Sequence, residues 1–142
     1  MDKNIFSSEI SSETHGRGYV YSIQYHLVWC TKYRRDVLVG DVEEDVKTYL
    51  TEICEQYSVN ILAMETMPDH VHMLIDCSPQ VFVPDLVKVL KGTSARKLYL
   101  AHPIIKNKLW GGHIWNPSYF VCTVSDRTRE LVTNYIKSQK SE

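Results

Sequence analysis

The sequence lacks the features of membrane, secreted and disulfide-stabilised proteins. None of its apolar runs approaches the roughly 18–20 residues that span a membrane, and its first residues lack the basic-then-apolar order of a signal peptide. The 4 cysteines form no C-x-x-C pair. Each lies in an apolar run, which favours reduced, buried side chains over disulfides or zinc ligands. We therefore expect a cytoplasmic protein that does not bind membranes.

Net charge is the second thing that the sequence lacks. With 16 Lys and Arg against 17 Asp and Glu, the formal charge is −1. Such a balance argues against a nucleic-acid partner, because nucleic-acid binders usually carry a basic surface. The two parts of the chain differ, however: residues 1–85 hold 6 basic and 14 acidic residues (−8), whereas residues 86–142 hold 10 and 3 (+7). The second part of the chain could therefore still bind a polyanion.

The composition is that of one globular domain. At 44% hydrophobic and 23% charged residues, the chain has enough apolar groups to offset the entropy lost on folding. Its 142 residues match the usual size of a single domain. Residues 1–15 are rich in Ser and Glu and show little periodicity. We therefore predict a polar N-terminal tail over residues 1–15 and a single domain over residues 16–142.

Strand and helix patterns alternate along this domain. β-Branched and aromatic residues predict strands over residues 19–31, 59–67, 70–77 and 118–124. Helical spacing predicts a helix after an N-cap at Asp41, a helix beginning near Pro84, and a helix over residues 127–140 capped by Ser125 or Asp126. The first six elements follow the order β-α-β-β-α-β. We therefore predict an α+β, ferredoxin-like (RRM-like) antiparallel sheet with two helices on one face and an additional C-terminal helix.

The first candidate site is the segment His70-Val71-His72 of the third predicted strand. Residues i and i+2 of a strand point the same way, so both imidazoles project from one face and Val71 from the other. Two neutral imidazoles side by side suit a divalent cation. So short a motif also arises by chance, and taken alone the pair also fits two structural or surface histidines.

The second candidate site lies on the last predicted helix, where Tyr135 and Gln139 are four residues apart and share a face. Taken alone, Tyr135 also fits a half-buried aromatic residue, and Gln139 a solvated residue at a helix end. Combined with His70 and His72, the helix adds a phenol and an amide oxygen. Three neutral ligands leave positions on Mg²⁺ or Mn²⁺ for phosphate oxygens, with the phenol in line with a phosphodiester.

Further motifs occur between residues 18 and 139. They are YHLVWCTKYRR (25–35), MPDHVHMLI (67–75), LKGTSAR (90–96), WNPSYFVCTV (115–124) and YIKSQ (135–139). In these motifs and their order the chain resembles the single-tyrosine HUH transposases, the small transposases of minimal bacterial and archaeal insertion sequences. The resemblance leaves residues 1–15 outside.

The resemblance implies a role for each candidate residue and an activity for the whole chain. It assigns His70, His72 and Gln139 as ligands of a divalent metal ion and Tyr135 as the nucleophile. The implied activity is cleavage and rejoining of single-stranded DNA at hairpin-bearing insertion-sequence ends, through a 5′-phosphotyrosine link. The implied assembly is a homodimer in which the tyrosine helix contributes in trans to the partner's histidine site.

Basic residues mark a predicted DNA-binding surface, because each Lys or Arg that neutralises a phosphate adds a salt-dependent increment to affinity. One group follows the first strand and the other lies on the second helix. The predicted DNA-binding residues are Lys32, Arg34, Arg35, Lys88, Lys91, Arg96 and Lys97. Each of them also fits an ordinary solvated surface charge. Trp110, Trp115 and Tyr33 are candidates for stacking on bases, although a Trp in a Gly- and Pro-rich segment also fits local core.

Other functions stay open from the sequence. A non-catalytic RRM-like nucleic-acid-binding module has the same element order, but it carries stacking aromatics on its central strands, where this chain has His70 and His72. A metal-dependent hydrolase would use water and leave Tyr135 a structural residue. A domesticated single-strand nickase would keep the chemistry without moving an element.

Overall fold

A computed structural model describes residues 14–16, 19–21, 23–108, 112–124 and 128–139. The strands are β1 (Thr14–Gly16), β2 (Tyr19–Tyr21), β3 (Gln24–Cys30), β4 (Asn60–Met67), β5 (His70–Asp76) and β6 (Phe120–Thr123). The α-helices are α1 (Gly40–Gln56), α2 (Val83–Ala101) and α3 (Thr128–Ser138). Short 3₁₀ turns lie at Lys32–Arg34 and Pro103–Lys108.

The main sheet has four antiparallel strands in the order β4-β5-β3-β6. The central strands β3 and β5 pair along their whole length, with Val28 opposite His72 and Cys30 opposite His70. Strands β4 and β5 form a hairpin closed at Pro68 and Asp69, as the sequence predicts. This order, with the helices between its strands, confirms the predicted ferredoxin-like fold.

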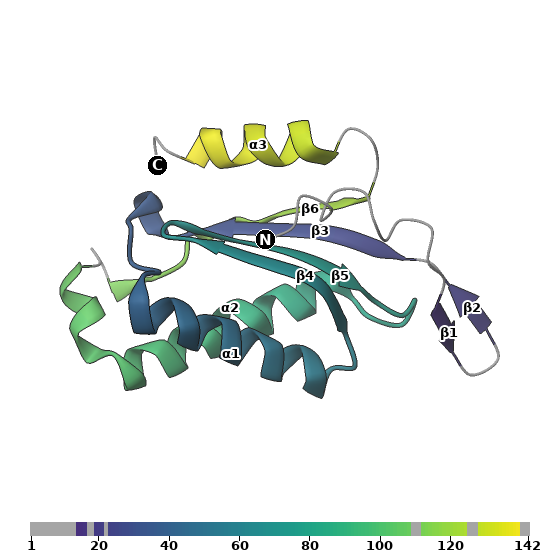
Figure 1. Ribbon diagram of the computed structural model, residues 1–142, viewed down its shortest axis with the longest axis horizontal. Coiled ribbons are helices and arrows are strands. Elements are labelled where there is room, and N and C mark those ends of the chain that lie inside the picture. The colour runs from purple at the N-terminus through teal and green to yellow at the C-terminus, as the bar shows by residue number, and fades with distance from the viewer. Residues whose placement is uncertain (1–13, 17–18, 22, 109–111, 125–127, 140–142) are drawn as a thin grey trace.

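The helices lie on opposite faces of the sheet (Figure 1). Helices α1 and α2 pack side by side beneath it, and α3 lies across the other face. The main hydrophobic core fills the space between the sheet and helices α1 and α2. It contains Leu27, Trp29, Val71, Met73 and Ile75 from the central strands. Because successive residues of a strand alternate between faces, His70 and His72 must face the α3 side.

The first predicted strand is wrong in one respect: residues 19–31 do not form one strand. Residues 19–21 form β2, which pairs with β1 in a separate two-stranded sheet, and the main-sheet strand β3 begins at Gln24. The pairing of β1 begins at Thr14, inside the segment predicted as a tail, and residues 1–13 lie outside the described ranges. High β-propensity therefore continues across a junction between two different sheets, which periodicity alone does not reveal.

Helix and strand ends differ from the predictions by one or two residues. Helix α1 begins at Gly40, so Asp41 lies in its first turn, and its N-cap is Val39. Strand β6 begins at Phe120 rather than at Ser118. The reason is local: the Ser118 amide donates to Oδ1 of Asn116 (3.0 Å), which holds residues 116–118 as a turn. The predicted caps Ser125 and Asp126 lie outside the described residues.

Two of the predicted absences can be checked. All four cysteines are free, and Cys30, Cys54 and Cys77 are buried, as their apolar surroundings indicate. Among the helices that the structure describes, none is long and apolar enough to cross a membrane.

Candidate active site

His70 begins strand β5, directly after the turn, and its ring is held by the preceding residue. Its Nδ1 lies 2.8 Å from Oδ1 of Asp69. The carboxylate also accepts bonds from Arg34, whose Nε and Nη2 lie 2.7 and 2.6 Å from Oδ2. Burial alone would raise the pKa of Asp69, but the hydrogen bonds from His70 and Arg34, with the charge of Arg34, lower it. Asp69 is therefore an anion that fixes the orientation of His70.

His72 is almost fully buried and contacts a second histidine from the neighbouring strand. Its Nε2 lies 2.9 Å from Nδ1 of His26, and its Nδ1 lies 4.0 Å from Oε1 of Glu65. Burial and the nearby charges of His26 and His70 lower the pKa of His72 to about 3, and burial lowers that of His26 to about 4. Both imidazoles are therefore neutral near pH 7.

Tyr135 of α3 and Gln139, directly after its end, meet at one side chain. Oγ of Ser118 lies 2.9 Å from the hydroxyl of Tyr135 and 3.3 Å from Oε1 of Gln139. The ring of Tyr135 packs on Phe120 of β6 at a centroid distance of 5.5 Å, and Gln139 is buried. Oγ of Ser118 also lies 2.9 Å from Oδ1 of Asn116, and in its pair with Tyr135 either hydroxyl can donate.

Ser118 is a site residue that the sequence reasoning missed, and so are the residues that hold it. Oδ1 of Asn116 accepts from both the amide and the hydroxyl of Ser118. The ammonium of Lys91 donates to the backbone oxygens of Asn116 (2.7 Å) and Ser118 (3.0 Å). In the sequence these residues are part of the motif WNPSYFVCTV, but the motif alone does not indicate what they do. Their contacts with Lys91 and Tyr135 join segments that are far apart in the chain.

The histidine pair fits a divalent cation by its chemistry. Both rings lie on the α3 face, and each has one nitrogen bonded to a protein group that can fix its tautomer, Asp69 for His70 and His26 for His72. Such outer partners are usual for metal-binding histidines. Because the Asp69 carboxylate can only accept, the proton of His70 lies on Nδ1 and its lone pair on Nε2. In the contact between His72 and His26, either ring can be the donor. Within the described part of the chain, no group of three or more His, Cys, Asp and Glu side chains could hold a metal ion.

The residues predicted to bind DNA fall into two groups in the structure. Arg34 and Lys91 are half-buried and bond to protein groups, and burial lowers the pKa of Lys91 to about 8. Lys32 and Lys97 are also half-buried, and Arg35, Lys88 and Arg96 are exposed. Of these, Lys32 and Arg35 lie over the exposed ring of Tyr33, and Lys97 forms an ion pair with Glu52 at 3.5 Å.

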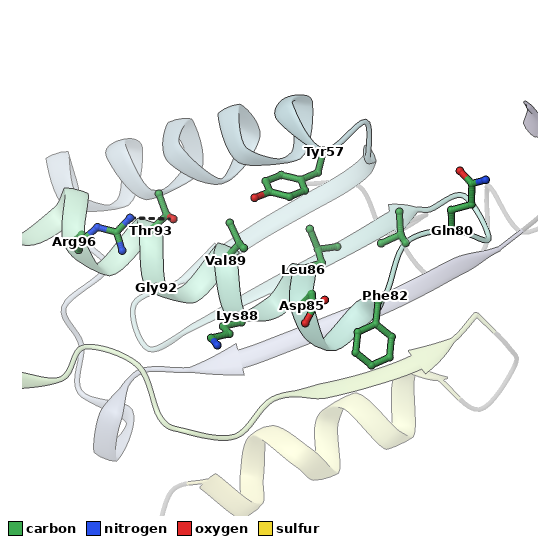
Figure 2. Close-up of a pocket in the computed structure, with 11 residues that line it drawn as sticks. Tyr57, Gln80, Phe82, Asp85, Leu86, Lys88, Val89, Gly92, Thr93 and Arg96 are labelled. Atoms are coloured by element: carbon green, nitrogen blue, oxygen red, sulfur yellow. Dashed lines mark hydrogen bonds between the residues drawn. The ribbon is translucent and has the colours of Figure 1, made fainter.

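Lys88 and Arg96 line an open groove along α2 with a volume of about 780 Å³ (Figure 2). The exposed rings of Tyr57 and Phe82 lie at the same groove. Because α2 covers the opposite face of the sheet from α3, the groove is remote from the histidine pair. Trp115 is buried against Trp29 and donates to Ser94, so it belongs to the core, while Trp110 lies outside the described residues.

The fold and this site define a class of protein. A ferredoxin-like sheet with a histidine pair on a central strand, covered by a helix that carries a tyrosine and a glutamine, is the arrangement of the single-tyrosine HUH transposases. The chain belongs to the family described as "Transposase IS200 like", which matches residues 19–139. It is therefore a DNA transposase by family, which is a class of DNA-cleaving enzyme, and the resemblance inferred from its motifs is confirmed.

Individual relatives agree with this assignment. The chain is 53% identical over 124 residues to the ISDra2 transposase TnpA of Deinococcus radiodurans, covering 87% of this chain and 89% of the relative. It is 34% identical over 122 residues to the transposase of insertion sequence element IS200 of Salmonella typhimurium, covering 86% and 80%.

Two solved structures share the fold. A crystal structure of a Deinococcus radiodurans protein described as a transposase matches with a TM-score of 0.84 at 49% identity, covering 89% of this chain and 97% of the other. A REP-associated tyrosine transposase bound to a REP hairpin matches with a TM-score of 0.55 at 13% identity, covering 91% and 76%, and shows the fold alone.

The buried histidines predict a pH dependence of stability. In the unfolded chain, His26 and His72 regain a pKa near 6.5, so the unfolded state binds more protons than the folded state between about pH 6.5 and pH 3. The free energy of unfolding is therefore at its highest, as far as these two imidazoles contribute, above pH 6.5. It falls as the pH drops through this window. We expect each imidazole to contribute a loss of about 2 kcal/mol between pH 7 and pH 5, measured by urea denaturation.

The matched variants are His26→Phe, which removes one buried imidazole, and His113→Gln, which changes an exposed one. His26→Phe should reduce the loss between pH 7 and pH 5 by about half, and His113→Gln should leave it unchanged. An unchanged pH dependence in His26→Phe would contradict the prediction.

Proposed function

We propose that this transposase cleaves and rejoins single-stranded DNA at hairpin-bearing insertion-sequence ends. Tyr135 is the nucleophile, and His70, His72 and Gln139 hold Mg²⁺ or Mn²⁺. The observation that carries the proposal is that α3 covers the face of the sheet from which the two histidines project. The proposed nucleophile and cation site thereby share one side of the sheet, which is what transfer of a phosphodiester requires.

The nucleophile needs activation, because a phenol has an ordinary pKa near 10 and is mostly protonated at pH 7. In this chain the phenol lies 2.9 Å from the neutral hydroxyl of Ser118, which orients the phenol oxygen without removing its proton. A divalent cation held by His70, His72 and Gln139 would supply Lewis-acid polarisation of the scissile phosphate and would favour the phenolate. His72, whose pKa burial lowers to about 3, would supply a neutral nitrogen ligand that does not compete with the phosphate by charge.

The product explains why no energy source is needed. Attack by the Tyr135 oxygen on phosphorus forms one phosphodiester, to tyrosine, and breaks another, with a 3′-hydroxyl as the leaving group. The two esters have similar energies, so a 3′-hydroxyl from a different DNA end can reverse the step and rejoin the strands. A water-using hydrolase would form no such link, and a nickase without rejoining would stop at the first step.

Hairpin DNA as the substrate is supported by two observations. One solved structure with the same fold holds a hairpin, although at 13% identity it supports the fold more than the ligand. In this chain Lys88 and Arg96 lie beside exposed aromatic rings at the groove on α2 (Figure 2). Cations next to aromatic rings suit a backbone phosphate and an unstacked base.

The covalent intermediate gives the main test. Wild-type protein mixed with labelled hairpin-bearing single-stranded DNA and Mg²⁺ should form an adduct that survives denaturing electrophoresis. Tyr135→Phe should lower adduct formation by at least about a thousandfold, because it removes the oxygen proposed to form the ester. Addition of EDTA should abolish the adduct in the wild type.

Tyr25→Phe is the matched control, since Tyr25 of β3 packs against the core on the face of the sheet opposite α3. It should form the adduct at the wild-type rate. Cleavage by Tyr135→Phe at the wild-type rate would refute the proposal and indicate attack by water.

The surface cations on α2 give a second test. Lys88→Ala and Arg96→Ala should each weaken binding of hairpin DNA and lower the slope of log affinity against log salt by about 1, because each removes one phosphate contact. The measurement is fluorescence anisotropy over roughly 50–200 mM salt. Lys47→Ala, an exposed lysine of α1 paired with Glu43, should leave the slope unchanged. Unchanged slopes in both α2 variants would exclude these residues from the DNA surface.

The third test concerns which subunit supplies the tyrosine. We propose a homodimer with the helix in trans, whereas in the single chain α3 contacts β3 and β6 of its own sheet. A trans site predicts that mixing Tyr135→Phe with His70→Ala restores about a quarter of wild-type cleavage, since half of the randomly mixed dimers carry one complete site of two. No restoration after subunit exchange would mean that each site is built within one chain.

A further inference from the structure

Arg34 contacts both halves of the proposed active site. Its Nε and Nη2 donate to Oδ2 of Asp69, the carboxylate whose other oxygen is bonded to His70. Its Nη1 donates to the backbone oxygen of Ile136 in α3 at 3.0 Å. Ile136 directly follows Tyr135. A chain of hydrogen bonds therefore runs from the candidate ligand His70 through Asp69 and Arg34 to the tyrosine helix.

The backbone around Arg34 is held in a conformation that non-glycine residues seldom adopt. Tyr33 and Arg34 have φ angles of 57° and 52°, two left-handed residues in succession. Buried Thr31 fixes this turn on the start of β5, because its amide donates to the backbone oxygen of Asp69 (2.9 Å) and its hydroxyl to that of Arg35 (2.7 Å). Disfavoured backbone persists where the surrounding structure determines it, and such residues cluster at functional sites.

We propose that Arg34 is a positioning residue that couples the orientation of His70 to the placement of the tyrosine helix, and that it does not bind DNA phosphate. The side chains of Arg34 and Asp69 are only 21% and 14% exposed. All three guanidinium nitrogens donate to protein oxygens. To bind Arg34, a phosphate would have to displace the Asp69 carboxylate, which lies 2.6 and 2.7 Å from the guanidinium nitrogens. Hydrogen bonds between charged groups at such distances are strong.

The first consequence concerns His70. With its proton on Nδ1 and directed at Asp69, the ring presents the lone pair of Nε2. Arg34 holds the carboxylate in the plane where it accepts that proton. Loss of an outer partner of this kind typically weakens metal affinity 10- to 100-fold.

The second consequence concerns α3. The hydrogen bond from Nη1 goes to a backbone oxygen, so it does not depend on the side chains of the helix. An α3 helix from the same chain or from a partner subunit could therefore accept it at this position. The guanidinium of Arg34 thus orients the proposed metal ligand His70 and also fixes the position of the helix that carries the proposed nucleophile. This inference rests on the proposed metal site and nucleophile, but measurements of the His70 tautomer, Mn²⁺ affinity and amide exchange need neither cleavage nor DNA.

The test compares Arg34→Gln and Asp69→Asn with Arg35→Gln, the adjacent exposed arginine. In metal-free protein, ¹⁵N NMR of the imidazoles should show His70 protonated on Nδ1 in the wild type and in Arg35→Gln. It should show a mixture of tautomers in the other two variants. Affinity for Mn²⁺, measured by electron paramagnetic resonance, should fall about tenfold in both and stay unchanged in Arg35→Gln. Amide exchange in α3 should speed up in Arg34→Gln only.

The double variant Arg34→Gln/Asp69→Asn adds a measure of coupling. If Arg34 acts on the metal site through Asp69, the double variant should bind Mn²⁺ no more weakly than Asp69→Asn alone. Circular dichroism spectra identify any variant that fails to fold, and Arg34→Lys, which keeps the charge but loses the planar fork, then replaces Arg34→Gln with the same expected loss of Mn²⁺ affinity.

One pattern of results would overturn the proposal: wild-type tautomer and Mn²⁺ affinity in Arg34→Gln, together with weaker hairpin binding and a smaller salt slope. That pattern would make Arg34 a phosphate contact. If instead the wild type forms no covalent adduct while the tautomer and Mn²⁺ results hold, the proposed function fails and the positioning role of Arg34 stands.

Discussion

Alternate side chains of the central strand β5 are buried under different helices. Val71, Met73 and Ile75 lie in the core beneath the sheet, with α1 and α2, and His70 and His72 project to the side of α3. A slip of one residue in the pairing of β5 would move Val71, Met73 and Ile75 out of the core and both histidines into it. The apolar face therefore fixes the register, and the register places the imidazoles at the site without any contribution from a metal ion.

Burial on the α3 side imposes a second requirement, because a buried polar group needs a partner. His72 has His26 from β3, and His70 has Asp69 from the turn. These partners differ in charge. Burial, together with His26 and His70, lowers the pKa of His72 to about 3, whereas Asp69 is an anion beside His70. The pair is thus one deeply buried imidazole beside another imidazole and one imidazole beside a carboxylate.

The sequence predicts those parts of the site that depend on local spacing. The i, i+2 spacing of His70 and His72 on a strand, and the i, i+4 spacing of Tyr135 and Gln139 on a helix, are local and survive in the structure. The element order likewise sets the sheet topology. What the sequence does not predict is set by long-range contacts: Ser118 to Tyr135, and Arg34 to Asp69 and Ile136. Nor does a sequence without glycine at residues 33 and 34 indicate left-handed backbone there.

The sequence also does not show which basic side chains are bonded to other groups of the protein. By residue type, Arg34 and Lys91 belong with the other basic residues, yet both donate to oxygens of the protein itself. In this structure these two side chains are bonded to the protein itself, whereas Lys88 and Arg96 lie along the groove on α2. The proposed active site on the α3 face and the cations on the α2 side are separated by the sheet (Figure 1). A nucleic acid that used both would have to turn around an edge of the sheet, and duplex DNA, with a persistence length of about 150 base pairs, resists so tight a turn. The single-stranded, hairpin-bearing DNA that we propose as the substrate would meet this constraint at low cost.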